Sequence, residues 1–325
     1  MKIPDEVFRI ANDIKTMKIR GASRIAQAAA YALKIASQYY KGGSAEEYME
    51  YISKVQEILR NTRPTAVSLP NALSYVMVRT HRAYERGESL EDIKRVTIEA
   101  ADEFIEYSKT ATKRIGEIGA RRIKDGDVIL THCNSSAALS VIIKAYESGK
   151  SISVYATETR PRFQGYITAK VLYEKGIKVT LIPDSAVRLV MKDVDRIIVG
   201  ADAVAANGAV VNKIGTSLIA LAAHEARVSF FVAAETYKFS PITVIGELIE
   251  IEERSPLEVV SKEFLNNKNI LVRNPAFDVT PPEYIDAIIT ERGIIPPQAA
   301  IIVLKEEYGW ALKDFIPKIV LEVEE

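Results

Sequence analysis

The stretch Asp127-Val-Ile-Leu-Thr-His-Cys-Asn-Ser-Ser-Ala-Ala-Leu139 contains the only cysteine of the 325-residue chain. Its apolar run at 128–130 is typical of a buried strand, and 137–145 is predicted to be a helix. Cys133 is therefore expected between the carboxyl end of a strand and the amino end of a helix. Free N–H groups and the helix dipole at such a place bind anions and favour a thiolate. The alternative interpretation of a lone cysteine is a small buried apolar side chain.

Outward from this stretch, short β-branched runs alternate with helical segments. The predicted strands are Val128–Thr131, Ile152–Tyr155, Val179–Ile182, Ile197–Val199, Phe230–Ala233 and Ile270–Val272. The predicted helices between them are Gln164–Glu174, Ala186–Met191 and Leu218–Ala226. Such alternation favours a parallel sheet covered by helices on both faces, with ligands at the carboxyl edge of the strands.

The residues before this region have only helical periodicity, as at Val7, Ile10 and Ile14. Ala45 to Arg60 is amphipathic, and a long helix is expected from Leu90 toward Gly119. The sequence therefore predicts an α/β protein in which a helical amino-terminal domain, 1–120, precedes a parallel-sheet domain, 121–325.

Composition excludes several classes of protein. Forty-three basic and 43 acidic residues give no net charge, which disfavours general nucleic-acid binding. No apolar run approaches the roughly 20 residues of a membrane span, and the amino terminus lacks the apolar core of a secretory signal, so we expect a cytoplasmic protein. Neither a G-x-G-x-x-G fingerprint nor a P-loop occurs. The three histidines are scattered, so no metal and no cofactor are expected.

A second candidate site is the stretch from Gly200 to Thr216. Asp202 directly follows a predicted strand, and Asn207-Gly208 is a hairpin-turn signal. Asn212 and Lys213 come just before a predicted helix, where a phosphate could bind. Alternatively, Asp202 is a loop cap and Lys213 a solvated charge.

Three further cations could bind an anion. Arg20-Gly21-Ala22-Ser23 places an arginine before a helix, as an anion clamp or merely a helix start capped by Ser23. Arg63 lies in the loop before Pro64, and Lys238 follows the strand at 230–233. With Lys213 these cations suit a substrate with two phosphates, because each phosphate carries about −1.5 to −2 charges.

The chain also combines motifs that are highly specific when found together: Arg20-Gly-Ala-Ser23, Arg63-Pro-Thr65, His132-Cys-Asn-Ser135, Glu158-Thr-Arg-Pro-Arg162, Gly200-Ala-Asp202, Asn207-Gly208, Asn212-Lys-Ile-Gly-Thr216 and Asn274-Pro-Ala-Phe-Asp-Val-Thr-Pro-Pro282. Over nearly its whole length it resembles the superfamily of sugar-phosphate isomerases and regulatory subunits of translation initiation factor 2B. Within it, the chain is most similar to the archaeal ribose-1,5-bisphosphate isomerase family.

The resemblance implies a Rossmann-like carboxyl-terminal domain, a homo-oligomer built from dimers, such as a hexamer, and a place in nucleoside-monophosphate (AMP) degradation. It implies that Cys133 and Asp202 are the catalytic pair. The residues implied to bind the sugar bisphosphate are Arg20, Gly21, Ala22, Ser23, Arg63, Ser135, Ser136, Ala137, Asn212, Lys213 and Lys238.

The implied reaction converts α-D-ribose 1,5-bisphosphate to D-ribulose 1,5-bisphosphate through a cis-phosphoenolate. Asp202 would protonate the ring oxygen, and Cys133 as a thiolate would take the proton from C2; a direct hydride shift is the rival path. Two other functions stay open: methylthioribose-1-phosphate isomerase, and a non-catalytic regulatory subunit of the translation factor. The catalytic pair favours an enzyme, because a regulatory subunit does not need it.

Overall fold

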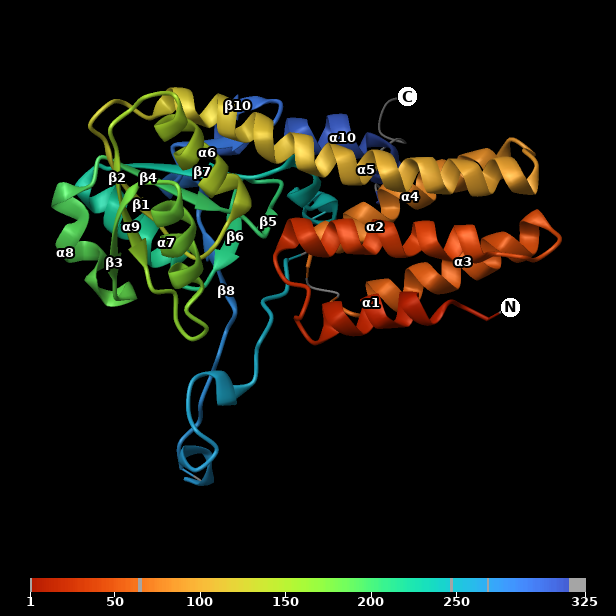
Figure 1. Cartoon of the computed structure of the whole chain (residues 1–325), viewed down its shortest axis with the longest axis horizontal. Helices are drawn as coiled ribbons and strands as arrows, with labels where there is room; N and C mark the ends of the chain where they lie inside the picture. Colours follow the sequence, from red (N-terminus) through yellow and green to blue (C-terminus); the bar gives the residue numbers. More distant parts are fainter. Residues whose placement is uncertain (1, 64–65, 246–247, 268, 316–325) are drawn as a thin grey trace, which may run out of the picture. The chain divides into compact units, whose positions relative to one another are not determined.

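The computed structural model describes residues 2–63, 66–245, 248–267 and 269–315 (Figure 1). The chain forms two compact units, Met1–Ala111 and Thr112–Glu325, and helix α5 (Leu90–Gly119) crosses the division between them. Pro64, from the loop predicted after Arg63, lies outside the described residues.

The first unit is helical, as predicted. Its helices are α1 (Asp5–Lys15), α2 (Ala22–Tyr39), α3 (Ala45–Arg60), α4 (Ser68–Glu85) and the first part of α5. The predicted apolar residues Val7, Ile10 and Ile14 are buried on α1. Helix α2 begins at Ala22 with Gly21 at its N-cap, so Ser23 lies inside the first turn. The expectation that Ser23 caps this helix was therefore wrong.

The second unit is built around a mostly parallel sheet. Among the described residues it has seven strands, in the order β10-β9-β7-β4-β1-β2-β3. Their bounds are β1 (Val128–Thr131), β2 (Ser153–Thr157), β3 (Lys178–Ile182), β4 (Arg196–Gly200), β7 (Ser229–Ala233), β9 (Ala287–Thr290) and β10 (Gly293–Ile295). The chain runs outward from β1 through β2 to β3, then returns to the other side of β1 at β4. The strand order therefore reverses between β1 and β4, which is where open α/β sheets bind ligands.

Both faces of this sheet are buried under helices (Figure 1). The helices of this unit are α6 (Ser136–Glu147), α7 (Gln164–Glu174), α8 (Val187–Val190), α9 (Thr216–Ala226) and α10 (Ala300–Phe315), with the end of α5. On β4, Ile197 and Val199 belong to the apolar cluster that includes residues of α8, α9 and α10. Ile198 belongs to the other cluster, with residues of α5, α6 and α7. Alternate residues of one strand thus enter opposite cores, which accounts for the continuous apolar runs in the sequence.

A small antiparallel sheet carries the second candidate site. It comprises β5 (Ala203–Val204), β6 (Val210–Lys213) and β8 (Phe277–Thr280). β5 and β6 form the hairpin predicted at Asn207-Gly208, with Gly208 at φ 86°. The hairpin is closed by the amide of Ala205, which donates to Ala209 O at 2.9 Å.

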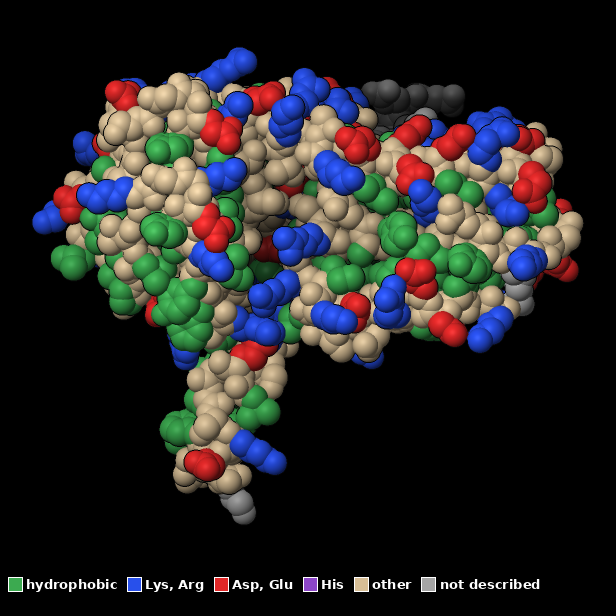
Figure 2. All heavy atoms as spheres, viewed as in Figure 1, with side chains coloured by type: hydrophobic (Ala, Val, Ile, Leu, Met, Phe, Trp, Pro, Cys, Tyr) green, Lys and Arg blue, Asp and Glu red, His purple; other side chains and the backbone are tan. Residues whose placement is uncertain are grey.

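The strand predicted at Ile270–Val272 was wrong. These residues lie in an arm, defined here as residues 248–267 and 269–276, which projects from the second unit (Figures 1 and 2). No ladder pairs with 270–272 among the described residues, and Leu271 is 93% exposed. A short apolar run needs a neighbouring strand to become one, and here it has none.

Candidate active site

Cys133 and Asp202 lie at the carboxyl ends of neighbouring strands. β1 ends two residues before Cys133, and β4 ends two residues before Asp202. The strands pair in parallel, with Leu130 opposite Ile197. The sheet therefore brings the two predicted catalytic residues to one edge, at the point where the strand order reverses.

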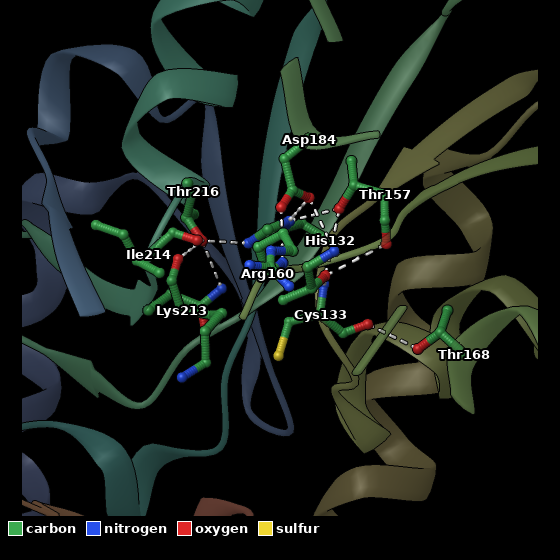
Figure 3. Close-up of polar contacts among 12 residues, drawn as sticks. His132, Cys133, Thr157, Arg160, Thr168, Asp184, Lys213, Ile214 and Thr216 are labelled. Atoms are coloured by element: carbon green, nitrogen blue, oxygen red, sulfur yellow. Dashed lines mark hydrogen bonds and ion pairs between the residues drawn. The ribbon is translucent and has the colours of Figure 1, made fainter. Parts of the chain in front are cut away.

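The backbone of Cys133 is fixed in an unusual conformation by two hydroxyl groups. Its φ is 65°, in the left-handed region that few residues other than glycine adopt. Its amide donates to Thr159 Oγ1 at 2.9 Å, and its carbonyl accepts from Thr168 Oγ1 at 2.7 Å. Figure 3 shows the side chain leaving this network with its sulfur directed away from it. The surrounding loops thus hold the thiol in a set direction.

The segment carrying Thr159 is held by Asp184, which follows β3. The carboxylate of Asp184 accepts from the amides of Thr159 at 2.8 Å and Arg160 at 2.7 Å. The peptide bond between Arg160 and Pro161 is cis, and Thr159 itself has φ 60°. The Glu158-Thr-Arg-Pro-Arg162 motif is thus a support for the Cys133 loop.

Cys133 is a thiol at neutral pH in this structure. Burial raises the pKa of Cys133 to about 11; Asp202 adds to the rise, while Lys213 and Arg254 oppose it. The backbone hydrogen bond of Asn134, just before α6, lowers the pKa of Cys133, but burial has the larger effect. Lys213 has the largest effect favouring the thiolate.

Lys213 ends β6 and is almost fully buried. Its ammonium donates to Ala276 O at 2.9 Å and lies 4.6 Å from the centre of the Phe277 ring. Burial lowers the pKa of Lys213, whereas Cys133 and Asp202 raise it. Asp202 thus affects the pKa of both Cys133 and Lys213, which indicates a single electrostatic site.

The start of α6, where Ser135, Ser136 and Ala137 are predicted to bind the substrate, has an N-cap of its own. The hydroxyl of Ser135 accepts from Ala138 N at 3.3 Å. The amides of Ser136 and Ala137 occupy the first turn, where a helix offers no acceptor of its own. A Cβ at Gly200 would lie 2.2 Å from Ser135 Oγ, so only glycine at the end of β4 leaves room for the capping serine.

The amino end of α9 is already occupied by a carboxylate. Asp278 on β8 accepts from Gly215 N at 2.7 Å and from Ser217 N at 3.1 Å. Burial raises the pKa of Asp278 to about 6, against these hydrogen bonds and Lys213, which lower it. A phosphate was expected at this helix end because Asn212 and Lys213 precede it. The phosphate-binding roles of Asn212 and Lys213 stay predictions, and in this structure Asn212 donates to Thr216 Oγ1 at 3.0 Å.

Lys238 lies in a short 3-10 turn after β7, where its ammonium pairs with Glu235. The Nζ–Oε2 distance is 2.6 Å, and both side chains are buried. The other oxygen of Glu235 accepts from Thr112 Oγ1 at 3.1 Å. Burial of this kind is typical of a structural or functional pair and not of the solvated surface charge that is the usual fate of a lysine.

Arg20 and Arg63 belong to the first unit. Arg20 and Gly21 directly precede α2, and Ser68, at the start of α4, donates from its hydroxyl to Ala22 O at 2.9 Å. The amino ends of α2 and α4 are therefore neighbours. The binding roles of Arg20, Gly21, Ala22, Ser23 and Arg63 stay predictions.

Several residues around the site were not found from the sequence. They are Thr157, Thr159, Thr168, Arg254 and Asp278. Arg254 in the arm pairs with Glu252 at 3.2 Å and helps to favour the Cys133 thiolate. Thr157 and Thr168 lie outside the quoted motifs, whereas Thr159 lies in the Glu158–Arg162 motif and Asp278 in the Asn274–Pro282 motif.

The described residues offer neither a membrane-spanning helix nor a metal site. None of the helices in that part of the chain combines the length and the hydrophobicity needed to cross a bilayer. The same residues contain no group of three or more His, Cys, Asp or Glu side chains placed to hold a metal ion.

Comparison with known proteins places the chain in a family. Residues 18–297 match the model of the initiation factor 2 subunit family. The ribose 1,5-bisphosphate isomerase of Thermococcus kodakarensis is 56% identical over 96% of this chain and 98% of its own, and that of Pyrococcus furiosus is 58% identical over 95% and 96%. The crystal structure of the translation initiation factor eIF-2B of Pyrococcus horikoshii superposes with a TM-score of 0.79 at 34% identity, covering 92% of this chain and 99% of that one. The chain therefore belongs to the initiation factor 2 subunit family, and within it to the group that contains the ribose 1,5-bisphosphate isomerases.

Proposed function

We propose that this chain is a ribose 1,5-bisphosphate isomerase, which converts α-D-ribose 1,5-bisphosphate to D-ribulose 1,5-bisphosphate. The observation that carries the proposal is the placement of Cys133 and Asp202 at one switch point of the sheet, with both of them raising the pKa of the buried Lys213. A regulatory subunit that only binds a partner has no use for a thiol and a carboxyl brought together beside a buried cation. The two relatives that are 56% and 58% identical to this chain are both named ribose 1,5-bisphosphate isomerase.

The substrate's anomeric phosphate sets the chemistry. Because C1 carries phosphate, the ring cannot open to a free aldehyde, and the ring oxygen must leave C1 while the phosphate stays. In our proposal Asp202 gives a proton to that oxygen, which becomes the C4 hydroxyl. C1 is left with positive character, which makes the proton on C2 far more acidic. A general acid placed at the leaving oxygen is the usual way to lower such a barrier.

Cys133 then acts on the carbon skeleton. Its thiolate removes the C2 proton, and the C1=C2 double bond of a cis-phosphoenolate forms. The C2 hydroxyl returns a proton to Asp202, and the thiol returns its proton to C1. The product has a ketone at C2 and a CH₂ phosphate at C1, and both protein groups regain their starting state. No step requires a further reactant.

The thiol form of Cys133 constrains this mechanism. With a pKa of about 11, the thiolate is a minor species at neutral pH before substrate binds. The ammonium of Lys213 is the largest influence that favours this species. Lys213 therefore has two parts in the proposal, as a phosphate ligand and as the cation that supports the base.

Direct assay with both candidate sugars tests the proposal. The purified chain is incubated with α-D-ribose 1,5-bisphosphate and, separately, with 5-methylthioribose 1-phosphate, and products are followed by phosphorus and proton NMR. We expect ribulose 1,5-bisphosphate from the first sugar and slow or no conversion of the second. Faster turnover of the methylthio sugar would move the assignment to the other isomerase, and no turnover of either would remove the enzymatic proposal.

A further inference from the structure

His132, the residue before the thiol, is a buried group that the proposed chemistry does not use. Only 1% of it is exposed, and both ring nitrogens are engaged. Nδ1 lies 2.6 Å from Thr157 Oγ1, and Nε2 lies 2.9 Å from the carbonyl oxygen of Ile214. A carbonyl can only accept, so Nε2 carries the proton and Nδ1 accepts from Thr157.

The ring is neutral at physiological pH. Burial lowers the pKa of His132 to about 4, Asp184 and the bond to Ile214 oppose that effect, and Lys213 adds to it. Asp184 Oδ1 is 3.9 Å from Nδ1. The neutral ring matches the arrangement of one donated and one accepted hydrogen bond, so His132 serves as a fixed connector and not as a titrating group.

The bond to Ile214 joins the two halves of the candidate site. His132 is one residue before Cys133 on the loop after β1, and Ile214 is one residue after Lys213 on the turn after β6. Figure 3 shows His132 between Ile214 and Thr157, and the Cys133 sulfur and the Lys213 side chain lie below it in this view. A hydrogen bond therefore links the backbone next to the thiol with the backbone next to its supporting cation.

The turn that accepts this bond is built to receive the ring. Gly215 has φ 103°, and a Cβ there would lie 3.2 Å from Cε1 of His132. On its other side, the turn is held by Asp278 through the amides of Gly215 and Ser217. The turn is thus fixed between Asp278 and His132.

We propose that His132 is a positioning residue that sets the distance between the Lys213 ammonium and the Cys133 thiol through its hydrogen bond to the carbonyl of Ile214. The hydrogen bond and its effect on the thiol exist without any substrate, and only the effect on catalysis rests on the proposed function. The attraction between an ammonium and a thiolate falls with distance and rises in a poorly hydrated site. If the turn at Ile214 moves away from His132, the Lys213 ammonium moves with it, and the electrostatic stabilisation of the Cys133 thiolate weakens.

Two substitutions separate this role from simple core filling. Gln at position 132 can place its amide nitrogen near the position of Nε2 and keep the bond to Ile214. Asn is shorter, so its amide reaches only the position of Nδ1 and Thr157. The readout is the rate at which iodoacetamide alkylates Cys133 between pH 7 and 10, followed by intact mass. Although protein atoms surround the thiol closely enough to raise its pKa, Cys133 keeps some accessible surface, and it is the only cysteine, so the signal has one source.

We expect His132→Asn to slow alkylation at pH 8 about tenfold, the effect of raising the thiol pKa by about one unit, and His132→Gln to stay within about threefold of the parent. In a Lys213→Met background, His132→Asn should slow alkylation less than about twofold, because the cation through which it acts is gone. Equal effects of Asn and Gln, or an equal Asn effect in both backgrounds, would overturn the proposal.

A further variant covers the case in which the Asn protein does not fold. Thr157→Val removes the donor to Nδ1 but leaves the bond to Ile214, so alkylation should stay within about threefold of the parent. A tenfold slowing would show that the Ile214 bond is not the one that matters. Since alkylation needs no substrate, these outcomes are independent of whether the chain turns over a sugar bisphosphate.

Discussion

Glu235 and Lys238 form a buried ion pair, with 2.6 Å between Oε2 and Nζ and side chains that are 0% and 4% exposed. Replacing Glu235 by Gln leaves the Lys238 ammonium buried without its carboxylate. We expect the free energy of unfolding to fall by about 3 kcal/mol or more. Urea unfolding followed by circular dichroism measures the change.

The chain offers a matched control for that pair. Arg188 and Glu225 approach to the same 2.6 Å, but their side chains are 77% and 60% exposed. Glu225→Gln should therefore change the free energy of unfolding only slightly, because water screens this exposed pair. The double variant Glu235→Gln/Lys238→Met should recover part of the lost stability, because it removes both charges. A cost for Glu235→Gln no larger than that for Glu225→Gln would contradict the importance of burial.

The catalytic pair is tested by Cys133→Ser and Asp202→Asn. Each change removes a proton-transfer group and keeps the size of the side chain. We expect turnover of ribose 1,5-bisphosphate to fall by about 10²-fold to 10⁴-fold. Calorimetric titration should show that the sugar still binds. A folded variant with near-full turnover would show that the residue does not have the role given to it.

The origin of the hydrogen at C1 separates the two possible paths. A substrate carrying deuterium at C2 is converted in ordinary water in a single turnover, and the product is examined by NMR and mass spectrometry. In the proton-transfer path the deuterium rests on Cys133 before it reaches C1, so exchange of that thiol with water places hydrogen at C1 in part of the product, which a hydride shift cannot do. Complete retention of deuterium at C1 is the outcome that the hydride shift predicts.

Thr159 should be needed for the geometry of the Cys133 loop. Thr159→Val keeps the shape of the side chain but leaves the amide of Cys133 without the acceptor at 2.9 Å. We expect a loss of about 1–3 kcal/mol in unfolding free energy and a fall in kcat larger than any change in KM. Thr159→Ser keeps the hydroxyl and is the control; if serine and valine behaved alike, the hydroxyl would not be what holds the loop.

Asp278 should make stability depend on pH in an unusual direction. The pKa of this carboxyl is about 6 in the folded protein against 3.8 for the free group. Between these values the folded state binds more protons than the unfolded state, so the free energy of unfolding falls as pH rises from about 4 to 6. The shift of about two pKa units corresponds to about 3 kcal/mol.

Asp278→Asn removes this titration. The stability of the variant relative to the parent should therefore improve by about 3 kcal/mol between pH 3.5 and pH 7, as measured by urea unfolding at each pH. The absolute offset reflects the changed hydrogen bonds at the start of α9, so the pH dependence carries the test. A difference that stays constant with pH would mean that Asp278 is not the titrating group.

The sequence predicted the local structure of this protein well where one pattern dominates. The helix at Ala45–Arg60 and the strand at Val128–Thr131 have the predicted bounds, and the hairpin at Asn207-Gly208 forms as expected. Each of these is decided by periodicity or by turn chemistry within a few residues. The failure at Ile270–Val272 has the opposite cause, because a strand exists only beside a partner.

What the sequence could not give is the set of contacts between distant segments. The reversal of strand order between β1 and β4 brings Cys133 and Asp202 together, and no periodicity encodes that order. The burial that keeps Cys133 a thiol comes from packing around it. Likewise, the carboxylate that fills the amino end of α9 comes from Asp278, some sixty residues away along the chain.

The strand order has a consequence for how this protein could change over time. The groups proposed to carry the reaction are attached to loops at the rim, while the two apolar clusters that stabilise the sheet lie beneath it and involve neither Cys133 nor Asp202. Two point substitutions could therefore silence catalysis and leave a folded body with its surfaces intact. Such a folded but inactive protein can still bind partners as a subunit of an assembly. An ancestor with this architecture could therefore have given rise to both enzymes and assembly subunits without passing through an unstable intermediate.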